Sequence, residues 1–222
     1  MGLSKTPVNG WAVSRRKTAV IVGILFFVQM ITAGIGTSLI QAFVNGNQNK
    51  APLTLGVLLM LCSGLAVTAI GLLMYPVLKQ VNQRLAIWYP IMRVTELAVS
   101  TAAGIYLLSQ LQVFPNYLLW VYIPTGIGGV ILTYLLFISK LVPRPIAVLG
   151  FVGYCALLLG VPLTLIGTLD ISKGAGQILL APGGLFEFLL LPIWLIAKGF
   201  HAPDSSSQTP LPPVLREAVV PS

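Results

Sequence analysis

The stretch that decides the fold class is "TAVIVGILFFVQMITAGIGTSLIQAFV", Thr18 to Val44, which contains no charged residue. A helix needs about 20 mostly apolar residues to cross the hydrocarbon core of a bilayer, and this stretch exceeds that length. It is also far longer than the apolar region of a signal peptide, and no A-x-A cleavage site follows it. We therefore interpret it as a retained membrane span.

The composition indicates that the rest of the chain follows the same pattern. Of 222 residues, 56% are hydrophobic and 8% are charged, and the mean hydropathy is +0.92. A soluble domain typically carries about 25% charged residues. Six apolar segments have the length of a span, at about 18–43, 52–75, 86–110, 117–139, 146–169 and 178–197. Because an open sheet would leave unpaired backbone groups in lipid, the sequence predicts an all-α polytopic membrane protein, a bundle of six transmembrane helices.

The distribution of lysine and arginine predicts the orientation. If the N-terminus is cytoplasmic, that side collects Lys5, Arg15, Arg16, Lys17, Lys79, Arg84, Lys140, Arg144, Lys198 and Arg216. The other side receives Lys50 and Lys173, and Arg93 within a span completes the 13 basic residues. This is the positive-inside pattern, so we expect both termini to be cytoplasmic. The net charge of +8 then lies near anionic lipid head groups and requires no nucleic-acid partner.

Three parts of the chain are expected. Residues 1–17 form a basic cytoplasmic N-terminus, and residues 18–200 form the six-helix transmembrane domain. Residues 201–222 are rich in proline and serine and are expected to be a disordered cytoplasmic tail.

Small residues and prolines mark where helices pack and where they bend. Two spans carry glycines seven residues apart, which place small residues on one face and let backbones approach closely: Gly64 and Gly71, then Gly153, Gly160 and Gly167. Three spans carry a proline that frees a carbonyl and is a candidate helix kink: Pro124, Pro162 and Pro192. Such breaks line cavities in some membrane proteins, although both residue types are also simply frequent in spans.

Three ionisable residues lie within the spans. Arg93 and Glu96, in "YPIMRVTELAVS", are three residues apart, so they share a helix face and can pair. Counted from Ala86 they lie roughly 10 and 15 Å deep, and the second depth is the midplane of a ~30 Å core. Glu187 lies about halfway along the sixth segment. Since charged side chains at this depth face the bundle interior, we predict an intramembrane polar cluster of Arg93, Glu96 and Glu187.

Arg93 can neutralise one carboxylate of this cluster but not two. The negative charge that remains must be removed by protonation of one glutamate, or compensated by a bound cation or by hydrogen bonds. One hypothesis is a proton or cation site. A second is an interhelical staple in which Arg93 clamps the third and sixth helices, and a third is that Arg93 extends to the cytoplasmic surface. We choose Glu187 as the glutamate that holds a proton near neutral pH, because Glu96 shares a helix face with Arg93.

Enzyme signatures are mostly missing. The only histidine, His201, follows the last span, which argues against paired haem histidines, a histidine-rich metal site or a Ser-His pair within the bundle. Cys62 and Cys155 fall near mid-membrane on separate helices, and we interpret them as packing residues rather than a disulfide. We therefore expect no cofactor and no metal.

Three stretches carry a family resemblance: "YPVLKQVNQRLAIWYPIMRVTE" (Tyr75–Glu96), "SKLVPRPIAVLG" (Ser139–Gly150) and "LFEFLLLPIWLIAKGF" (Leu185–Phe200). They resemble a bacterial membrane family catalogued as domain of unknown function 4386, over roughly residues 16–200. The resemblance implies a six-helix bundle in the inner membrane. It also implies the R-x-x-E of the third helix and the late glutamate, which fall on Arg93, Glu96 and Glu187. It brings no known activity.

The leading hypothesis is a non-enzymatic binding or transport protein with a polar intramembrane site at Arg93, Glu96 and Glu187. Its ligand would be a small molecule, a proton or a cation. The alternative is a structural or accessory helical subunit of a larger membrane complex, with the cluster as an interhelical staple. A third hypothesis, an intramembrane enzyme using a glutamate as acid or base, is disfavoured by the missing histidines and metal clusters.

Overall fold

The computed structural model of the chain describes residues 8–46, 49–113, 116–171 and 174–201. The first five spans contain the helices α1 (Val8–Val44), α2 (Lys50–Leu78), α3 (Gln83–Ala86), α4 (Trp88–Gln110), α5 (Tyr117–Ser139) and α6 (Arg144–Leu165). The sixth contains a 3-10 helix η1 (Gly174–Leu180), α7 (Ala181–Leu185), a π-helix η2 (Phe186–Leu190) and α8 (Leu191–Ala197).

Six helical stretches in the described part of the chain are long and apolar enough to cross a membrane. They are Arg15–Val44, Lys50–Leu78, Gln83–Gln110, Leu118–Ser139, Arg144–Leu165 and Gly176–Ala197. Large apolar side chains on their outward faces stay exposed, such as Leu72 (58%), Ile105 (63%) and Leu159 (65%). A bilayer solvates such side chains, whereas a soluble monomer rarely exposes large apolar patches. The prediction of an all-α, six-helix membrane protein is confirmed, and the chain is a multi-pass membrane protein.

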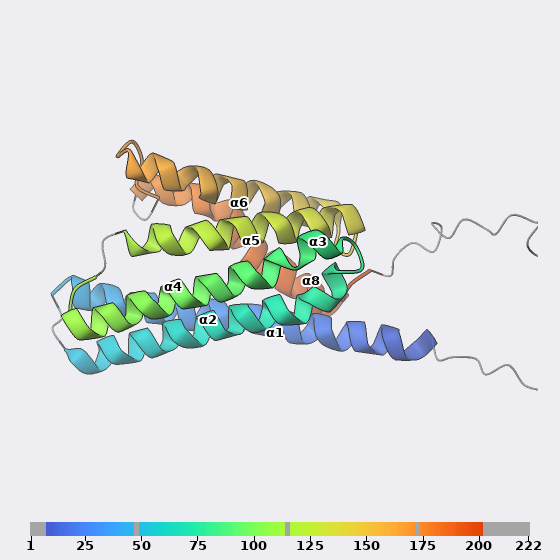
Figure 1. Cartoon of the computed structure of the whole chain (residues 1–222), viewed down its shortest axis with the longest axis horizontal. Helices are drawn as coiled ribbons and strands as arrows, with labels where there is room; N and C mark the ends of the chain where they lie inside the picture. The colour runs from blue at the N-terminus through green and yellow to red at the C-terminus, as the bar shows by residue number, and fades with distance from the viewer. Residues whose placement is uncertain (1–7, 47–48, 114–115, 172–173, 202–222) are drawn as a thin grey trace, which may run out of the picture.

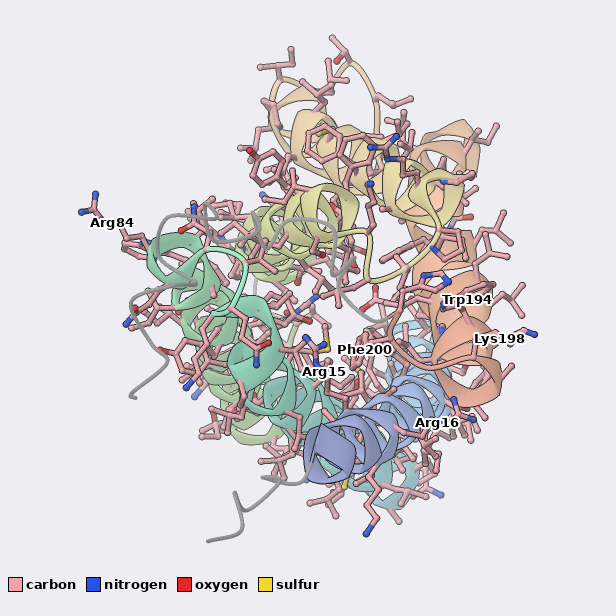
Figure 2. All side chains as sticks on the ribbon, turned by 90° about the vertical axis from the view of Figure 1, so that its right-hand side faces the viewer. Arg15, Arg16, Arg84, Trp194, Lys198 and Phe200 are labelled. Atoms are coloured by element: carbon pink, nitrogen blue, oxygen red, sulfur yellow. The ribbon has the colours of Figure 1, made fainter. Side chains whose placement is uncertain are left out.

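The spans form a ring in chain order. Contacts run from α1 to α2, α2 to α4, α4 to α5, α5 to α6 and α6 to α7, and α8 returns to α1. Figure 1 shows α5 and α6 along one side of the molecule and α1, α2 and α4 along the other. The view along the helices in Figure 2 shows the same ring from the end where α1 begins. Short connections between antiparallel helices favour this arrangement, because consecutive helices become neighbours.

The ring is closed by a side chain that caps a helix. Arg16 of α1 donates hydrogen bonds to the carbonyl oxygens of Ile196 at 2.7 Å and of Leu195 and Ala197 at 3.3 Å. These carbonyls lie at the end of α8, and that of Leu195 also accepts from the N–H of Gly199 at 3.1 Å, so the guanidinium adds to the capping of the last turn. The first span therefore holds the end of the last one.

Four of the five predicted packing glycines lie at close contacts, three of them between helices. A Cβ at Gly64 would meet Leu97, one at Gly71 would meet Arg93, and one at Gly160 would meet Ile171. A Cβ at Gly153 would collide with the backbone of Gly183 in α7. The prediction is wrong for Gly167, because α6 ends at Leu165 and Gly167 adopts φ +75° in the following turn, with no atom within 4 Å.

Helix boundaries differ from the predicted ones at both ends of the chain. The first helix begins at Val8, within the expected basic N-terminus. The helix of the fifth span, α6, ends at Leu165 rather than at residue 169. The sixth span is interrupted by 3-10 and π segments. The tail predicted to be disordered lies, apart from His201, outside the described residues.

Candidate intramembrane binding site

Arg93 on α4 is the largest fully buried side chain and is only 1% exposed. Two glycines make room for it. A Cβ at Gly71 of α2 would lie 3.2 Å from the Cβ of Arg93, and a Cβ at Gly128 of α5 would lie 3.9 Å from its Nε. The hydroxyl of Thr68 on α2 also donates to the backbone carbonyl of Arg93 at 3.3 Å. The small residues of the neighbouring helices thus let a long cation lie in the bundle interior instead of facing lipid.

The guanidinium pairs first with its own helix. Arg93 Nη1 donates to Glu96 Oε2 at 2.7 Å, the distance of a charge-assisted hydrogen bond. The three-residue spacing brings the two side chains together along one face of α4. The guanidinium carbon also lies 5.2 Å from the ring centre of Tyr89, one turn earlier, within cation–π range.

Glu187 approaches the same guanidinium from the sixth span. Its Oε1 lies 4.0 Å from Arg93 Nη2, and the residue is 8% exposed. The structure therefore brings together all three ionisable residues singled out in the sequence. Their pairing is unequal, since only Glu96 is within hydrogen-bonding distance of Arg93.

Glu187 lies in the π-helix, where the backbone of the sixth span widens. The N–H of Leu191 donates to the carbonyl of Phe186, five residues earlier, and Pro192 follows with no N–H of its own. π-bulges of this kind are rare and occur frequently at functional sites. The local irregularity turns the Glu187 side chain toward the bundle interior, next to Arg93.

Several buried polar atoms around the cluster have no hydrogen-bond partner in the described part of the chain. They are Arg93 Nε and Nη2, the hydroxyls of Tyr89 and Tyr154, and Gln29 Oε1. Tyr154 and Gln29 are the polar neighbours of Glu187 on α6 and α1. The ring of Tyr154 lies over Gly129 and meets Phe186 edge to face, with ring centres 6.1 Å apart. Buried polar groups in native proteins are usually paired with protein groups or with water.

Gln29, Tyr89 and Tyr154 were not predicted from the sequence to belong to the cluster. A signal was present for the first, because Gln29 is an uncharged polar residue in the middle of an apolar span. The two tyrosines resemble ordinary residues of a span, and only their packing against the cluster distinguishes them.

A cavity of about 250 Å³ lies beside the cluster and is partly open. Its wall is drawn from α1, α4, α5, α6 and the sixth span, and it includes both glutamates but not Arg93. The residues of this wall that carry polar side chains are Gln29, Glu96, Tyr122, Thr125, Tyr154 and Glu187. The carboxylates therefore face a space large enough for a small ligand.

None of the three prolines named as kink candidates is part of the cavity wall. Pro124 is inside α5, next to Thr125 of the wall, and Pro162 is inside α6 near its end. Pro192 stands in the first turn of α8, directly after the π-helix. A further proline, Pro76, lies inside α2.

Metal-ligating residues do not gather at the cluster. In the ranges that the structure describes, no group of three or more His, Cys, Asp or Glu side chains could hold a metal ion. His201 lies at the end of the last span, where its ring is 5.4 Å from that of Trp194 and its N–H donates to the carbonyl of Leu141. Cys62 and Cys155 are free thiols, one exposed and one half-buried.

Comparison with known proteins gives a family and no described relative. Neither the curated proteins nor the solved structures contain a match to the chain. One family model matches, over residues 21–117 and 107–199, which together extend from the first span to the end of the sixth. The chain belongs to the family described as Domain of unknown function (DUF4386).

Proposed function

We propose that this chain is a non-enzymatic binding or transport protein whose intramembrane site, at Arg93, Glu96 and Glu187, takes a proton or a cation. The observation that carries the proposal is the unequal sharing of one arginine. Glu96 has a hydrogen bond from Arg93 at 2.7 Å, whereas Glu187 lies 4.0 Å away in the wall of a cavity. If both carboxylates ionise, the cluster carries a surplus negative charge that a proton or cation from the cavity can neutralise.

We further propose that the protein lies in a bacterial inner membrane with both termini in the cytoplasm. Figure 2 shows Arg15, Arg16, Arg84 and Lys198 at one end of the bundle. Basic residues near span ends favour the cytoplasmic side and its anionic lipids. With this orientation the start of α5 and the end of α6 face the outside.

An enzymatic role has less support from the residues near the cluster. General acid–base chemistry could use Glu96 or Glu187, but no histidine lies beside them, since His201 packs against Trp194 at the far end of the span. The cavity also has no group of metal ligands within the described residues. Binding or transport therefore accounts for the buried charges with fewer assumptions.

One observation favours the alternative of a structural subunit. The Arg93–Glu187 approach links α4 to the sixth span, and a cluster that only fastens two helices needs no ligand. In that case Glu187 would hold its proton permanently. The two functions differ in whether the charge at Glu187 changes when the pH or the cation concentration changes.

A measurement of charge displacement on a solid-supported membrane distinguishes the binding or transport function from the structural one. Liposomes containing the full-length protein are exposed to a rapid change of pH at a low concentration of other cations, so that proton binding is not offset by release of a cation. The proposal predicts a transient current that is lost in Glu187→Gln while the variant stays folded and abundant. A wild-type current equal to that of protein-free liposomes would rule out the binding and transport function and favour the staple.

A further inference from the structure

We infer that the cavity beside Glu187 binds a small organic cation that carries an alkylammonium group. This inference rests on the proposed function and narrows its ligand from any cation to one chemical class. It follows from the electrostatics of the cavity wall, from its aromatic and apolar surface, and from its size.

The charge of the wall selects a cation. Glu96 and Glu187 both line the cavity, while the single compensating cation, Arg93, is buried against α2 and α5 outside the wall. Two further groups of the wall can accept hydrogen bonds and have no partner in the described part of the protein, namely Gln29 Oε1 and the Tyr154 hydroxyl. Their residues are 9% and 2% exposed, so these acceptors are held inside the bundle.

The rest of the wall suits alkyl groups on that cation. The rings of Tyr122, Tyr154 and Phe188 line the cavity. An aromatic face attracts an ammonium group, more strongly where water is excluded. Apolar side chains complete the wall, among them Val121, Leu157 and Leu180. This pairing of a carboxylate with aromatic rings is the combination that recognises alkylammonium ions.

A bare metal ion fits the same wall less well. Hard cations such as Ca²⁺ and Mg²⁺ require about six or more oxygen ligands at roughly 2.0–2.6 Å, converging on one point. The described residues contain no group of three or more His, Cys, Asp or Glu side chains that could hold such an ion. The cavity of about 250 Å³ is also many times the ~10–15 Å³ that holds one water molecule, which is more space than a single ion needs.

The position of the cavity indicates the side of entry. It extends from Glu96, at the middle of α4, toward Val121 and Tyr122, one turn inside the beginning of α5. In the orientation proposed above, the beginning of α5 faces the outside. An alkylammonium ion would therefore reach Glu187 from outside the cell, passing Tyr122 first.

Binding of radiolabelled tetramethylammonium to the full-length protein in lipid nanodiscs tests the inference. We expect saturable binding that Glu187→Gln abolishes and that an equal concentration of sodium chloride leaves largely intact. Tyr122→Leu should weaken binding about tenfold, through the loss of one cation–π contact, while Tyr122→Phe keeps the ring and the affinity. Trp120→Leu is the matched control, because Trp120 lies on the same helix, is 55% exposed and is outside the wall.

The other results of the tetramethylammonium experiment contradict the inference, and some of them also contradict the proposed function. Absence of saturable tetramethylammonium binding overturns the organic-cation inference, as does binding that survives Glu187→Gln or is unaffected by Tyr122→Leu. If radioactive sodium then binds the same nanodiscs and Glu187→Gln removes it, the proposed function stands with a different ion. If neither cation binds and the charge-displacement signal is absent, the proposed function fails as well.

Discussion

The Oε1 atom of Glu187 lies 4.0 Å from Nη2 of Arg93, across the interface between the sixth span and α4. This distance is too long for a hydrogen bond, whereas Glu96 accepts one from Nη1 of the same guanidinium at 2.7 Å. The two glutamates therefore have different roles in the electrostatics of the bundle. In the proposed function, Glu96 is the partner that neutralises Arg93, and Glu187 is the carboxyl group available to a ligand.

Arg93→Ala should lower the free energy of unfolding by about 3–5 kcal/mol, the cost of removing one partner of a buried pair and leaving Glu96 unpaired. Arg93→Ala combined with Glu96→Gln should recover much of that loss, because the remaining side chain carries no charge. Reversible unfolding in mixed detergent micelles measures both. Equal stability of the single and double variants would show that Glu96 is not the ionised partner.

Glu187→Gln should change the unfolding free energy by less than about 1 kcal/mol, because glutamine has the shape of a protonated glutamic acid and can make similar hydrogen bonds. The same detergent titration checks this value. A loss as large as that of Arg93→Ala would mean that Glu187 is an ionised partner of the guanidinium and that the proton is assigned to the wrong glutamate.

Infrared difference spectroscopy can identify which glutamate holds a proton. Near neutral pH we expect a carboxylic acid C=O band that disappears in Glu187→Gln and persists in Glu96→Gln. The charged and titratable groups that face Glu187 are Arg93 and Glu96 from α4 with Tyr89 one turn earlier, and Tyr154 from α6. A band that disappears in Glu96→Gln alone would reverse the assignment.

Gly153→Ala should destabilise the protein by about 1–3 kcal/mol, because its new methyl group collides with the backbone of Gly183, which cannot rotate away. The collision also lies in the cavity wall, so ligand binding should be lost with it. Gly34→Ala is the matched control, since no atom lies within 4 Å of its position. If the two variants are equally stable, the close approach of α6 and α7 is absent in the membrane.

Cysteine labelling tests the proposed orientation. In a background with Cys62 and Cys155 replaced, Gly174→Cys should react with a membrane-impermeant maleimide in intact cells. Arg84→Cys, at a side chain that projects outward from the bundle in Figure 2, should react only after the cells are opened. The reverse pattern would place the termini outside.

The fold could be predicted from the sequence because each span is a long apolar run, and a bilayer leaves an apolar run of that length few alternatives to a helix. The cluster could be predicted because charged residues at membrane depth are costly and face inward. The break in the sixth span could not be predicted in detail. Pro192 indicates a disturbed helix, but it does not specify whether the freed backbone groups form a kink or the π-helix that contains Glu187.

The uncharged residues of the site also could not be predicted from the sequence. The structure places Gln29 and Tyr154 beside Glu187 although they come from α1 and α6, and no local spacing connects residues so far apart in the chain. Gly167, in contrast, was predicted from the sequence to be a packing residue and is not one. Its seven-residue spacing matched the packing pattern of α6, but the helix ends at Leu165 and the glycine serves a turn with φ +75°.

The central claim is that Glu187 exchanges a proton for a cation that enters the cavity. Its most direct test is proton release from the purified protein in weakly buffered solution near neutral pH, followed with a pH-sensitive dye as tetramethylammonium or sodium is added. We predict saturable release of about one proton per chain from the wild type and none from Glu187→Gln. Wild-type protein that releases no proton with either cation, or a Glu187→Gln variant that releases as much as wild type, would contradict the claim.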